Sequence, residues 1–389
     1  MKGAWRKTTI GDVITLQRGV DITKTQMEPG NVPVVSSSGI SGYHNTAHSK
    51  GPGVIIGRKG SLGTAYYVVQ DYWPHDTTLW VRDFKGNLPR FVYYFLKSMD
   101  FKRLDVGSAN PTLNRNHVHP LEVTWPDVET QGAIADILGS LDDKIELNRQ
   151  MNETLEQMAM ALYKHWFVDF GPFQDGEFVE SELGPIPKGW NPGSLDDMAT
   201  TRSEVVQPTE TMTEVPYIGL EHMPRGSIAL DIWGDSKEVA SGKFRYLKGD
   251  ILFGKLRPYF KKVGVAPNDG ICSTDIYVLQ PKQPFWFGVV LGQVIQQAFI
   301  DHCSNGASGT KMPRTNWGQM CRYRIAIPPD SVGKEFNVLI QTFVHQIRAN
   351  IDETQTLISI RDYLLPRLLS GEIALQEAEE TVEEALAHG

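Results

Sequence analysis

The sequence has few cysteines, no long apolar run and no overall excess of positive charge. Its three cysteines, Cys272, Cys303 and Cys321, are an odd number and show no Cys-x-x-Cys spacing. This usage is typical of a reducing compartment and argues against a disulfide framework and a zinc site. No run of about eighteen apolar residues is present, so we expect no transmembrane helix. The N-terminal stretch MKGAWRKTTIGD lacks the apolar core of a secretory signal, which predicts a cytoplasmic protein.

Catalytic motifs are also missing. The sequence contains no P-loop, no His-Glu-x-x-His and no visible Ser-His-Asp arrangement, and GRKGSLG has the wrong spacing for a dinucleotide turn. NPTL and IPPD do not match the Asn/Asp-Pro-Pro-aromatic loop of adenine methyltransferases. We expect His117 and His119 to be loop or core residues rather than metal ligands. These absences predict a chain that is not itself an enzyme and that binds no metal or cofactor.

One segment superficially resembles a nuclease motif. PDVET, which contains Asp127, is followed by Asp142 and Lys144 in an acid-x-lysine arrangement. We discount it because Asp142, Asp143 and Lys144 lie inside a heptad pattern, where charged residues usually form a solvated face. The second half of the chain has no acid-x-lysine counterpart.

The length and the distribution of charge are more informative than the totals. A chain of 389 residues accommodates two ordinary domains. The net charge of −8 owes most to the tail from Glu372 to Gly389, which carries six glutamates and no Lys or Arg. By contrast, the segment from Lys243 to Lys262 has seven basic residues and one acid. A local basic patch of this kind is what binds phosphates.

The chain is an internal duplication. TTIGDV is matched by GSLDDM, and GPGVIIGRKG by KGDILFGKLR. The segments PHDTTLWV and CSTDIYVL align Asp76 with Asp275, and VTWPDV and IAIPPD align Pro126 with Pro328. Two polar loops, GSANPTLN and GASGTKMP, also occupy equivalent positions. The order of the matches is preserved, which predicts two similar modules.

Each half ends in a long helix with a coiled-coil pattern. Apolar residues follow a four-three spacing, and Asn148 and Asn350 interrupt it at equivalent positions. We predict that the two helices pack on each other and that the asparagines fix their register; ordinary amphipathic helices on separate domains are the alternative. The predicted seam consists of Ile134, Leu138, Leu141, Ile145, Asn148, Leu155, Leu162, Phe336, Ile340, Phe343, Ile347, Asn350, Leu357 and Leu364.

Short strands and one central helix are expected in each module of about 130 residues, so the fold class is α/β with mixed α+β character. Two similar recognition domains would be separated by two long antiparallel helices that form a coiled coil. The expected segments are a first domain (1–128), a central spacer helix (129–170), a linker (171–189), a second domain (190–330), a distal spacer helix (331–372) and an acidic tail (373–389), which we expect to be a disordered or partner-facing appendage.

Basic and polar side chains concentrate in equivalent loops of the two modules. Lys and Arg neutralise phosphates, Arg can pair with guanine, and Asn can pair with adenine. Ordinary solvated loops are the alternative. The candidate DNA-binding residues are Arg58, Lys59, Ser108, Asn110, Thr112, Asn114, Arg115, Lys255, Arg257, Tyr259, Lys261, Lys262, Thr310, Lys311, Arg314 and Asn316.

This arrangement indicates how the chain would use DNA. Two modules at opposite ends of an antiparallel helix pair would read two half-sites about one DNA turn apart, with the helices setting the spacing. Two other interpretations remain open. A self-contained nuclease or methyltransferase would need a catalytic constellation, and a coiled-coil scaffold would leave the basic loops unexplained.

The motifs together resemble the specificity subunit of a type I restriction–modification enzyme. The resemblance rests on GDVITLQRG, ALYKHWFVDFGPF running into ELGPIPKGW, the duplicated polar loops and the closing RDYLLPRLLSGEI, and it extends to about Ile373. It implies two target-recognition domains for a split, asymmetric double-stranded DNA site. It also implies two methyltransferase subunits that use S-adenosylmethionine, and motor–nuclease subunits that use ATP and Mg. No base-contacting residue is carried over, because recognition domains of this family diverge widely.

Overall fold

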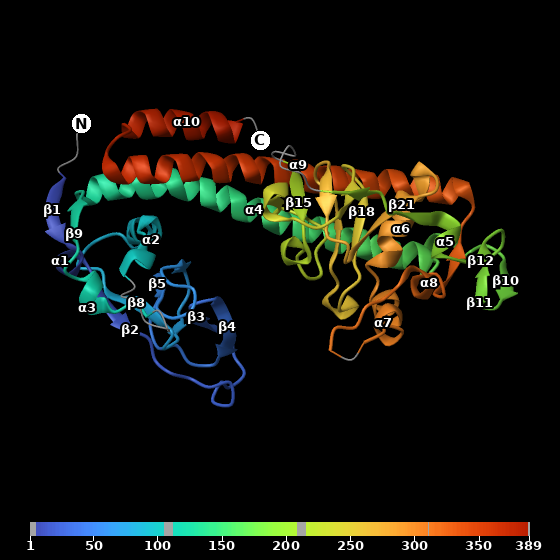
Figure 1. Ribbon diagram of the computed structural model, residues 1–389, viewed down its shortest axis with the longest axis horizontal. Coiled ribbons are helices and arrows are strands. Elements are labelled where there is room, and N and C mark those ends of the chain that lie inside the picture. The colour runs from blue at the N-terminus through green and yellow to red at the C-terminus, as the bar shows by residue number, and fades with distance from the viewer. Residues whose placement is uncertain (1–4, 105–111, 208–214, 310, 388–389) are drawn as a thin grey trace. The chain divides into compact units, whose positions relative to one another are not determined.

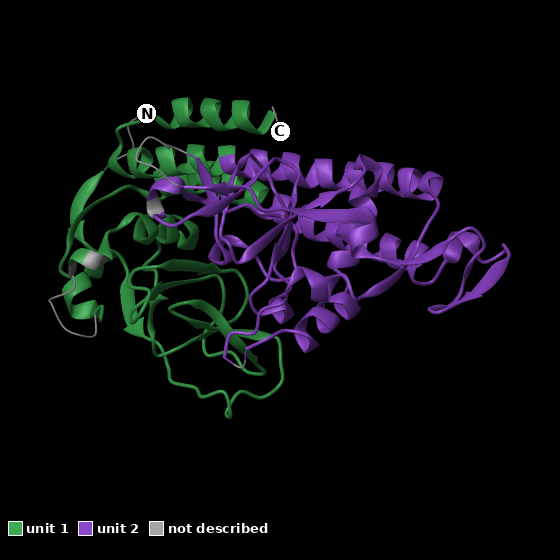
Figure 2. Ribbon diagram, turned by 45° about the vertical axis from the view of Figure 1, so that its right-hand side comes forward, with its two compact units in different colours: residues 1–145, 356–389 green, residues 146–355 purple. Residues whose placement is uncertain are grey.

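The computed structural model describes residues 5–104, 112–207, 215–309 and 311–387. The chain forms two compact units (Figure 2): unit 1 contains residues 1–145 and 356–389, and unit 2 contains residues 146–355. Each unit therefore holds one module and part of both long helices. The domain bounds predicted from the sequence keep each long helix whole. The two compact units instead divide both long helices near their middles.

The module of unit 1 contains three small sheets. A four-stranded sheet has the order β2-β8-β5-β6, a three-stranded sheet the order β4-β3-β7, and β1 pairs with β9. The strands are β1 (Arg6–Thr9), β2 (Thr15–Arg18), β3 (Val32–Ser36), β4 (Gly39–His44), β5 (Gly53–Gly57), β6 (Ala65–Val68), β7 (Trp73–Pro74), β8 (Thr78–Asp83) and β9 (Glu122–Trp125). The helices of this module are α1 (Ile10–Val13), α2 (Pro89–Ser98), η1 (Phe101–Leu104) and α3 (Arg115–Val118).

The module of unit 2 repeats this plan. Its four-stranded sheet has the order β13-β21-β18-β19, its five-stranded sheet the order β14-β17-β20-β15-β16, and β12 pairs with β22. The strands are β12 (Asn191–Ser194), β13 (Ala199–Arg202), β14 (Val205–Val206), β15 (Pro216–Ile218), β16 (Gly234–Asp235), β17 (Lys243–Tyr246), β18 (Ile251–Gly254), β19 (Val263–Val265), β20 (Gly270–Cys272), β21 (Ile276–Pro281) and β22 (Arg324–Ile327). The helices are α5 (Leu195–Met198), η3 (Leu220–His222), η4 (Ser236–Glu238), η5 (Pro258–Phe260), η6 (Pro284–Trp286), α6 (Phe287–Val294), α7 (Gln297–Asn305) and α8 (Trp317–Met320).

The predicted duplication is confirmed at the level of strand register. Arg6 pairs with Trp125 in the first module, and Asn191 pairs with Ile327 in the second, at the equivalent ends of the two strand pairs. Each first strand leads into a one-turn helix with a capping box, formed by Thr9 with Asp12 in α1 and by Ser194 with Asp197 in α5. These reciprocal caps satisfy backbone donors and direct β2 and β13 into their sheets.

The mixed α/β class is confirmed, but most strand pairs are antiparallel. Only β3–β7 and β15–β20 are parallel among the pairs of named strands in the described residues. Short turns join consecutive antiparallel strands such as β3 and β4 or β5 and β6. Strands that are distant in the chain, such as β2 and β8, also pair antiparallel. The predicted linker contains η2 (Gly171–Phe173) and an antiparallel hairpin of β10 (Phe178–Ser181) and β11 (Gly184–Pro187).

The two long helices form the predicted pair. α4 covers Val128–Phe167 and α9 covers Asp330–Ser370 (Figure 1). In unit 1 the first part of α4 packs on the last part of α9, and in unit 2 the last part of α4 packs on the first part of α9, so the helices are antiparallel in each. The alternative of separate amphipathic helices is therefore wrong. The buried seam residues are Ile134, Leu138, Leu141, Ile145, Asn148, Phe336, Ile340, Ile347, Asn350, Leu357 and Leu364.

Three predicted seam residues, Leu155, Leu162 and Phe343, are only partly buried. Tyr163 and Val344, which follow two of them directly, are buried instead. The buried stripe shifts in α4 because the same helix also packs on the second module. There the Tyr163 hydroxyl donates to Gln293 Oε1 of α6 at 2.6 Å.

A buried polar layer interrupts the apolar seam in unit 2. Asn148 Nδ2 donates to Thr354 Oγ1 at 3.3 Å, and Asn350 Nδ2 donates to Asn152 Oδ1 at 2.8 Å. Asn148 and Asn350 are equivalent in the duplication, as are Asn152 and Thr354. The two hydrogen bonds are therefore the same contact formed twice across a pseudo-twofold axis. A buried amide that requires a polar partner disfavours other registers of a helix pair.

The acidic tail contains a helix, so the expectation of a disordered appendage is wrong. α10 covers Leu375–Ala387, and its Ala378 and Val382 are buried in the same apolar cluster as Leu365 and Leu369 of α9. The glutamates lie between these apolar positions at helical spacing, which is an amphipathic pattern. No helix in the described part of the chain is long and apolar enough to cross a membrane.

A buried carboxylate connects α4 to the second module. Glu156 is 6% exposed, and its Oε1 accepts hydrogen bonds from Ser227 Oγ at 2.7 Å and from the N–H groups of Ile228 and Ala229 at 3.1 Å. Ile228 in turn accepts from the N–H of Val265 in β19. Burial raises the pKa of Glu156, whereas these hydrogen bonds oppose the shift. Through Glu156 the helix thereby holds residues 227–229, which in turn bind β19.

We predict that Glu156→Ala destabilises unit 2 by roughly 2–3 kcal/mol, because it leaves buried donors without an acceptor. Glu156→Gln, which retains an acceptor oxygen, should cost less. The measurement is denaturant unfolding of the full chain, with Glu153→Ala, an exposed position on the same helix, as the control. Equal stability of the two alanine variants would contradict the anchoring role.

Candidate nucleic-acid interface

The basic turns and polar loops, far apart in the sequence, meet in both modules. In the first, the N–H of Leu113 donates to the carbonyl of Arg58 at 2.9 Å; in the second, the N–H of Thr315 donates to the carbonyl of Lys255 at 3.1 Å. Isolated bridges pair Lys59 with Thr112 and Leu256 with Arg314. The structure thus brings the two predicted groups of residues together twice, in equivalent ways.

In the first module these groups line a hollow of about 620 Å³. Arg58, Asn114 and Arg115, all predicted candidates, contribute to its wall together with Arg18 and Asp76. Arg58 is partly buried, and its Nη1 donates to the carbonyl of Asp76 at 3.4 Å. Burial, and after it repulsion from Arg18, lowers the pKa of Arg58. Lys59 and Arg115 are exposed.

Two residues in and beside this hollow were missed by the sequence reasoning. Arg18, at the end of β2, places its Nη2 at 2.9 Å from Asp76 Oδ2, and its side chain is 56% exposed. His75 places its Nδ1 at 3.2 Å from Asp76 Oδ1. Arg18 was not considered because it lies outside the repeated loops. Arg18 reaches Asp76 because β2 pairs with β8, and the sequence pattern did not indicate that pairing.

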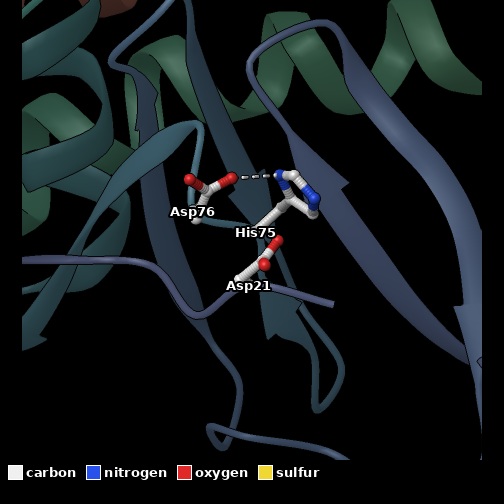
Figure 3. A group of neighbouring side chains, drawn as sticks. All are labelled: Asp21, His75 and Asp76. Carbon is white, nitrogen blue, oxygen red and sulfur yellow. Dashed lines mark ion pairs between the residues drawn. The ribbon is translucent and has the colours of Figure 1, made fainter. Parts of the chain in front are cut away.

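Asp21, His75 and Asp76 lie close together (Figure 3) and could offer three ligand atoms within 4.8 Å of one another. However, the Arg18 guanidinium already contacts Asp76. That positive charge offsets the attraction of the cluster for a cation. The arrangement is a polar network that orients side chains at the edge of the hollow.

In the second module several predicted DNA-binding residues make internal contacts. Lys255 Nζ donates to the carbonyl of Thr274 at 2.7 Å and lies 4.1 Å from the centre of the Tyr277 ring. Burial lowers its pKa. Lys262 Nζ donates to the carbonyl of Leu220, and Arg257 Nη2 donates to that of Lys311. Several basic side chains of this segment thus already bind backbone carbonyls within the module.

The basic turn of the second module also has unusual backbone geometry. Arg257 and Lys261 both have a φ of 50° and flank the turn η5. Left-handed backbone is unfavourable for residues other than glycine and often occurs at functional sites. The turn presents Tyr259, which is 52% exposed, while Arg225 packs on the ring of Phe260 at 3.8 Å. Tyr259 is therefore held on a shaped surface loop.

The polar loops supply both caps and surface residues. Asn114 caps α3 by accepting from the N–H of Asn116, and Asn316 caps α8 by accepting from that of Gln319. These asparagines therefore stabilise the first turns of α3 and α8. The sequence predicted them only as DNA-binding residues. Lys311 is exposed, and Arg314 pairs with Asp275 through its Nε and Nη2 at 3.0 and 3.3 Å. Ser108, Asn110 and Thr310 lie outside the described residues.

Known proteins with sequences similar to this chain are specificity subunits of type I restriction enzymes. Residues 2–157 match the model of the type I restriction modification DNA specificity domain. The chain is 28% identical over 312 residues to the type I restriction enzyme MjaIX specificity subunit of Methanocaldococcus jannaschii, a match that covers 75% of this chain and 71% of that protein. It is 27% identical to the HindI specificity subunit of Haemophilus influenzae, with 74% of this chain and 78% of that protein covered.

A solved structure shows the same fold. The type I restriction–modification S subunit from M. genitalium superposes with a TM-score of 0.58 at 16% identity, and the match covers 94% of this chain and 96% of that one. The fold is thus that of two mixed α/β modules and two long helices. In sequence the chain is similar to the specificity subunits of type I restriction–modification enzymes, the family that its motifs resemble.

A histidine links the polar loop of the first module to the strand that carries Arg18. His119 follows α3, and its Nε2 accepts a hydrogen bond from the N–H of Leu16 at 3.0 Å. This contact confirms the expectation of a loop or core residue. Burial, followed by repulsion from Arg115 and Lys85, lowers the pKa of His119. The neutral ring is therefore the form that the fold favours.

We predict that unit 1 loses stability on acidification. A histidine with a folded-state pKa below its unfolded value of about 6.5 supports the fold above that pH, and the support is lost as the pH falls through the folded-state pKa. The thermal unfolding midpoint of the wild-type chain should decrease between pH 7 and pH 5. The midpoint of the His119→Gln variant should decrease by a smaller amount over the same range. His117→Gln, at an exposed neighbouring position, is the control. Identical pH profiles for all three proteins would contradict the prediction.

Proposed function

We propose that this chain is the sequence-recognition subunit of a type I restriction–modification system, in which each module reads one half of a split, asymmetric DNA site. One observation carries the proposal: the same surface, a basic turn joined to a polar loop, is built twice on equivalent scaffolds. The side chains on the two copies differ, because Lys59 and Thr112 in the first correspond to Leu256 and Arg314 in the second. Equivalent scaffolds with different side chains suit two different target sequences.

The long helices set the spacing between the half-sites and dock the partner subunits. α4 has 40 residues and α9 has 41, and a helix of this length extends roughly 60 Å at about 1.5 Å per residue. The polar layer around Asn148 and Asn350 supports this role because it favours one register. The partners are two methyltransferase subunits and, in a complete system, two motor–nuclease subunits.

Recognition is the role of this chain, and catalysis belongs to its partners in the cytoplasm. Asp127 and Asp142, two residues of the segment that resembled a nuclease motif, have structural roles. Asp127 caps α4 by accepting from the N–H of Thr130 at 2.9 Å. Asp142 accepts from Tyr94 in α2 and from Arg361 in α9, both at 2.8 Å, so it belongs to an interior contact rather than a solvated face. S-adenosylmethionine, ATP and Mg are used by the partner subunits.

Mapping adenine methylation across the host genome, with and without this gene, tests the proposal. We expect deletion to remove methylation from one split motif, made of two short blocks separated by unspecified bases. Re-expression of the chain should restore that motif. An unchanged methylome in cells that express the gene and its methyltransferase partner would contradict the proposal and favour a protein-joining scaffold.

Lengthening the helices tests their role in spacing. Four residues inserted after Asn148, with four at the equivalent position after Asn350, should add about one helical turn to both helices. We expect the methylated motif to keep both blocks and to gain a longer gap. Four residues inserted in the turn between β10 and β11 provide the control and should leave the gap unchanged. A constant gap in the helix variant would show that the helices do not set the spacing.

A further inference from the structure

An acidic residue occupies the same turn in both modules. In the first module, the N–H of Thr78 donates to the carbonyl of His75 and closes the turn before β8. In the second module, the N–H of Ile276 donates to the carbonyl of Ser273 and closes the turn before β21. Asp76 and Asp275 lie inside these turns. Their positions are adjacent rather than identical, because the turn bonds align Asp275 with Thr77. The sequence alignment of the two acids is therefore one residue out of register.

Each acid holds an arginine, and the two arginines come from different elements. Asp76 pairs with Arg18 from the end of β2, and Asp275 pairs with Arg314 from the polar loop. The position equivalent to Arg314 in the first module is Thr112, since both form the bridge to the basic turn. The two modules thus present an arginine beside the same turn from two different directions.

The geometry of these pairs leaves the guanidinium groups able to bind a ligand. Arg18 and Arg314 are 56% and 49% exposed, while Asp76 and Asp275 are less exposed, at 18% and 32%. A guanidinium carries five N–H donors. Within the described residues, the bonds to the carboxylates use one nitrogen of Arg18 and two of Arg314. Exposed ion pairs add little to stability, so the main effect of each carboxylate is to fix the orientation of its arginine.

An oriented arginine matches the chemistry of guanine. The O6 and N7 atoms of guanine accept two hydrogen bonds in the major groove, and an arginine held in one plane presents parallel N–H groups to both. The surroundings also suit DNA, because Arg18 and Asp76 line the hollow shared with Arg58 and Arg115.

We propose that Arg18 and Arg314 each read a guanine, one in each half-site, and that Asp76 and Asp275 are positioning residues that hold them. This inference rests on the proposed function and adds the residues that determine specificity. It accounts for different half-sites on equivalent scaffolds, because the arginine approaches the DNA from β2 in one module and from the polar loop in the other. Each half-site should accordingly contain at least one G·C pair.

The test uses the full chain assembled with its methyltransferase partner. Binding is measured on duplexes in which each base pair of both half-sites is replaced in turn, over a range of salt concentrations. Arg314→Ala should weaken binding to the cognate duplex roughly tenfold to hundredfold and remove the preference at one G·C pair of one half-site. Arg18→Ala should do the same in the other half-site. Asp76→Asn and Asp275→Asn should weaken the preference at the same two pairs.

Matched controls remove another exposed arginine that pairs with a carboxylate in the same module. Arg103 pairs with Asp100 in unit 1, and Arg245 pairs with Glu204 in unit 2. Arg103→Ala and Arg245→Ala should leave the base preference at every position unchanged. Thermal unfolding of each variant separates a loss of folding from a loss of recognition.

The outcomes distinguish this inference from the proposed function. If the wild-type complex binds all duplexes equally, the proposed function itself fails. If the wild type reads a split site but Arg18→Ala and Arg314→Ala weaken all duplexes uniformly and reduce the salt dependence, the arginines contact phosphates and the inference is wrong. Unchanged binding by both variants would also overturn it, because the ion pairs would then lie away from the DNA.

Discussion

The rest of the structure depends on how α4 is shared between two packing partners. Along its first part, in unit 1, apolar residues face α9, and Asp142 joins α2 and α9 by accepting from Tyr94 and Arg361. Along its last part, in unit 2, Glu156 and Tyr163 also bind the second module. A helix in this position must satisfy two interfaces with one set of side chains. That requirement explains why polar residues occur in a stripe that would otherwise be apolar.

The same constraint shows how much of the fold the sequence could predict. The duplication, the two modules and most of the seam followed from spacing alone, because burial imposes a heptad period on helices that pack as a left-handed coiled coil. The errors lie where a third surface intervenes. Leu155 and Leu162 fit the heptad, yet the module packed on α4 draws Tyr163 and Glu156 into the interior instead. The spacing of apolar residues within α4 cannot show that a module from another part of the chain also packs on this helix.

The candidate site was predictable in location and less so in the role of each residue. The basic turns and polar loops were recognised because they occur twice, and they do meet. However, Lys255 and Lys262 bind backbone carbonyls inside the module, and Asn114 and Asn316 cap helices. Residue type reports what a side chain is able to bind, but not whether the fold already uses it. Arg18 was missed for the opposite reason, since only the tertiary fold brings it to Asp76.

The duplication separates what must stay constant from what can change. Strand register, the capping boxes of α1 and α5 and the contact between basic turn and polar loop recur in both modules, because altering them would alter the scaffold. The exposed ends of β2 and of the polar loops carry few such constraints. An arginine can therefore move from one element to the other and still find a carboxylate in the same turn. Under the proposed function, such a scaffold would change the sequence that it reads through a few surface substitutions, while its core and its helix register remain the same.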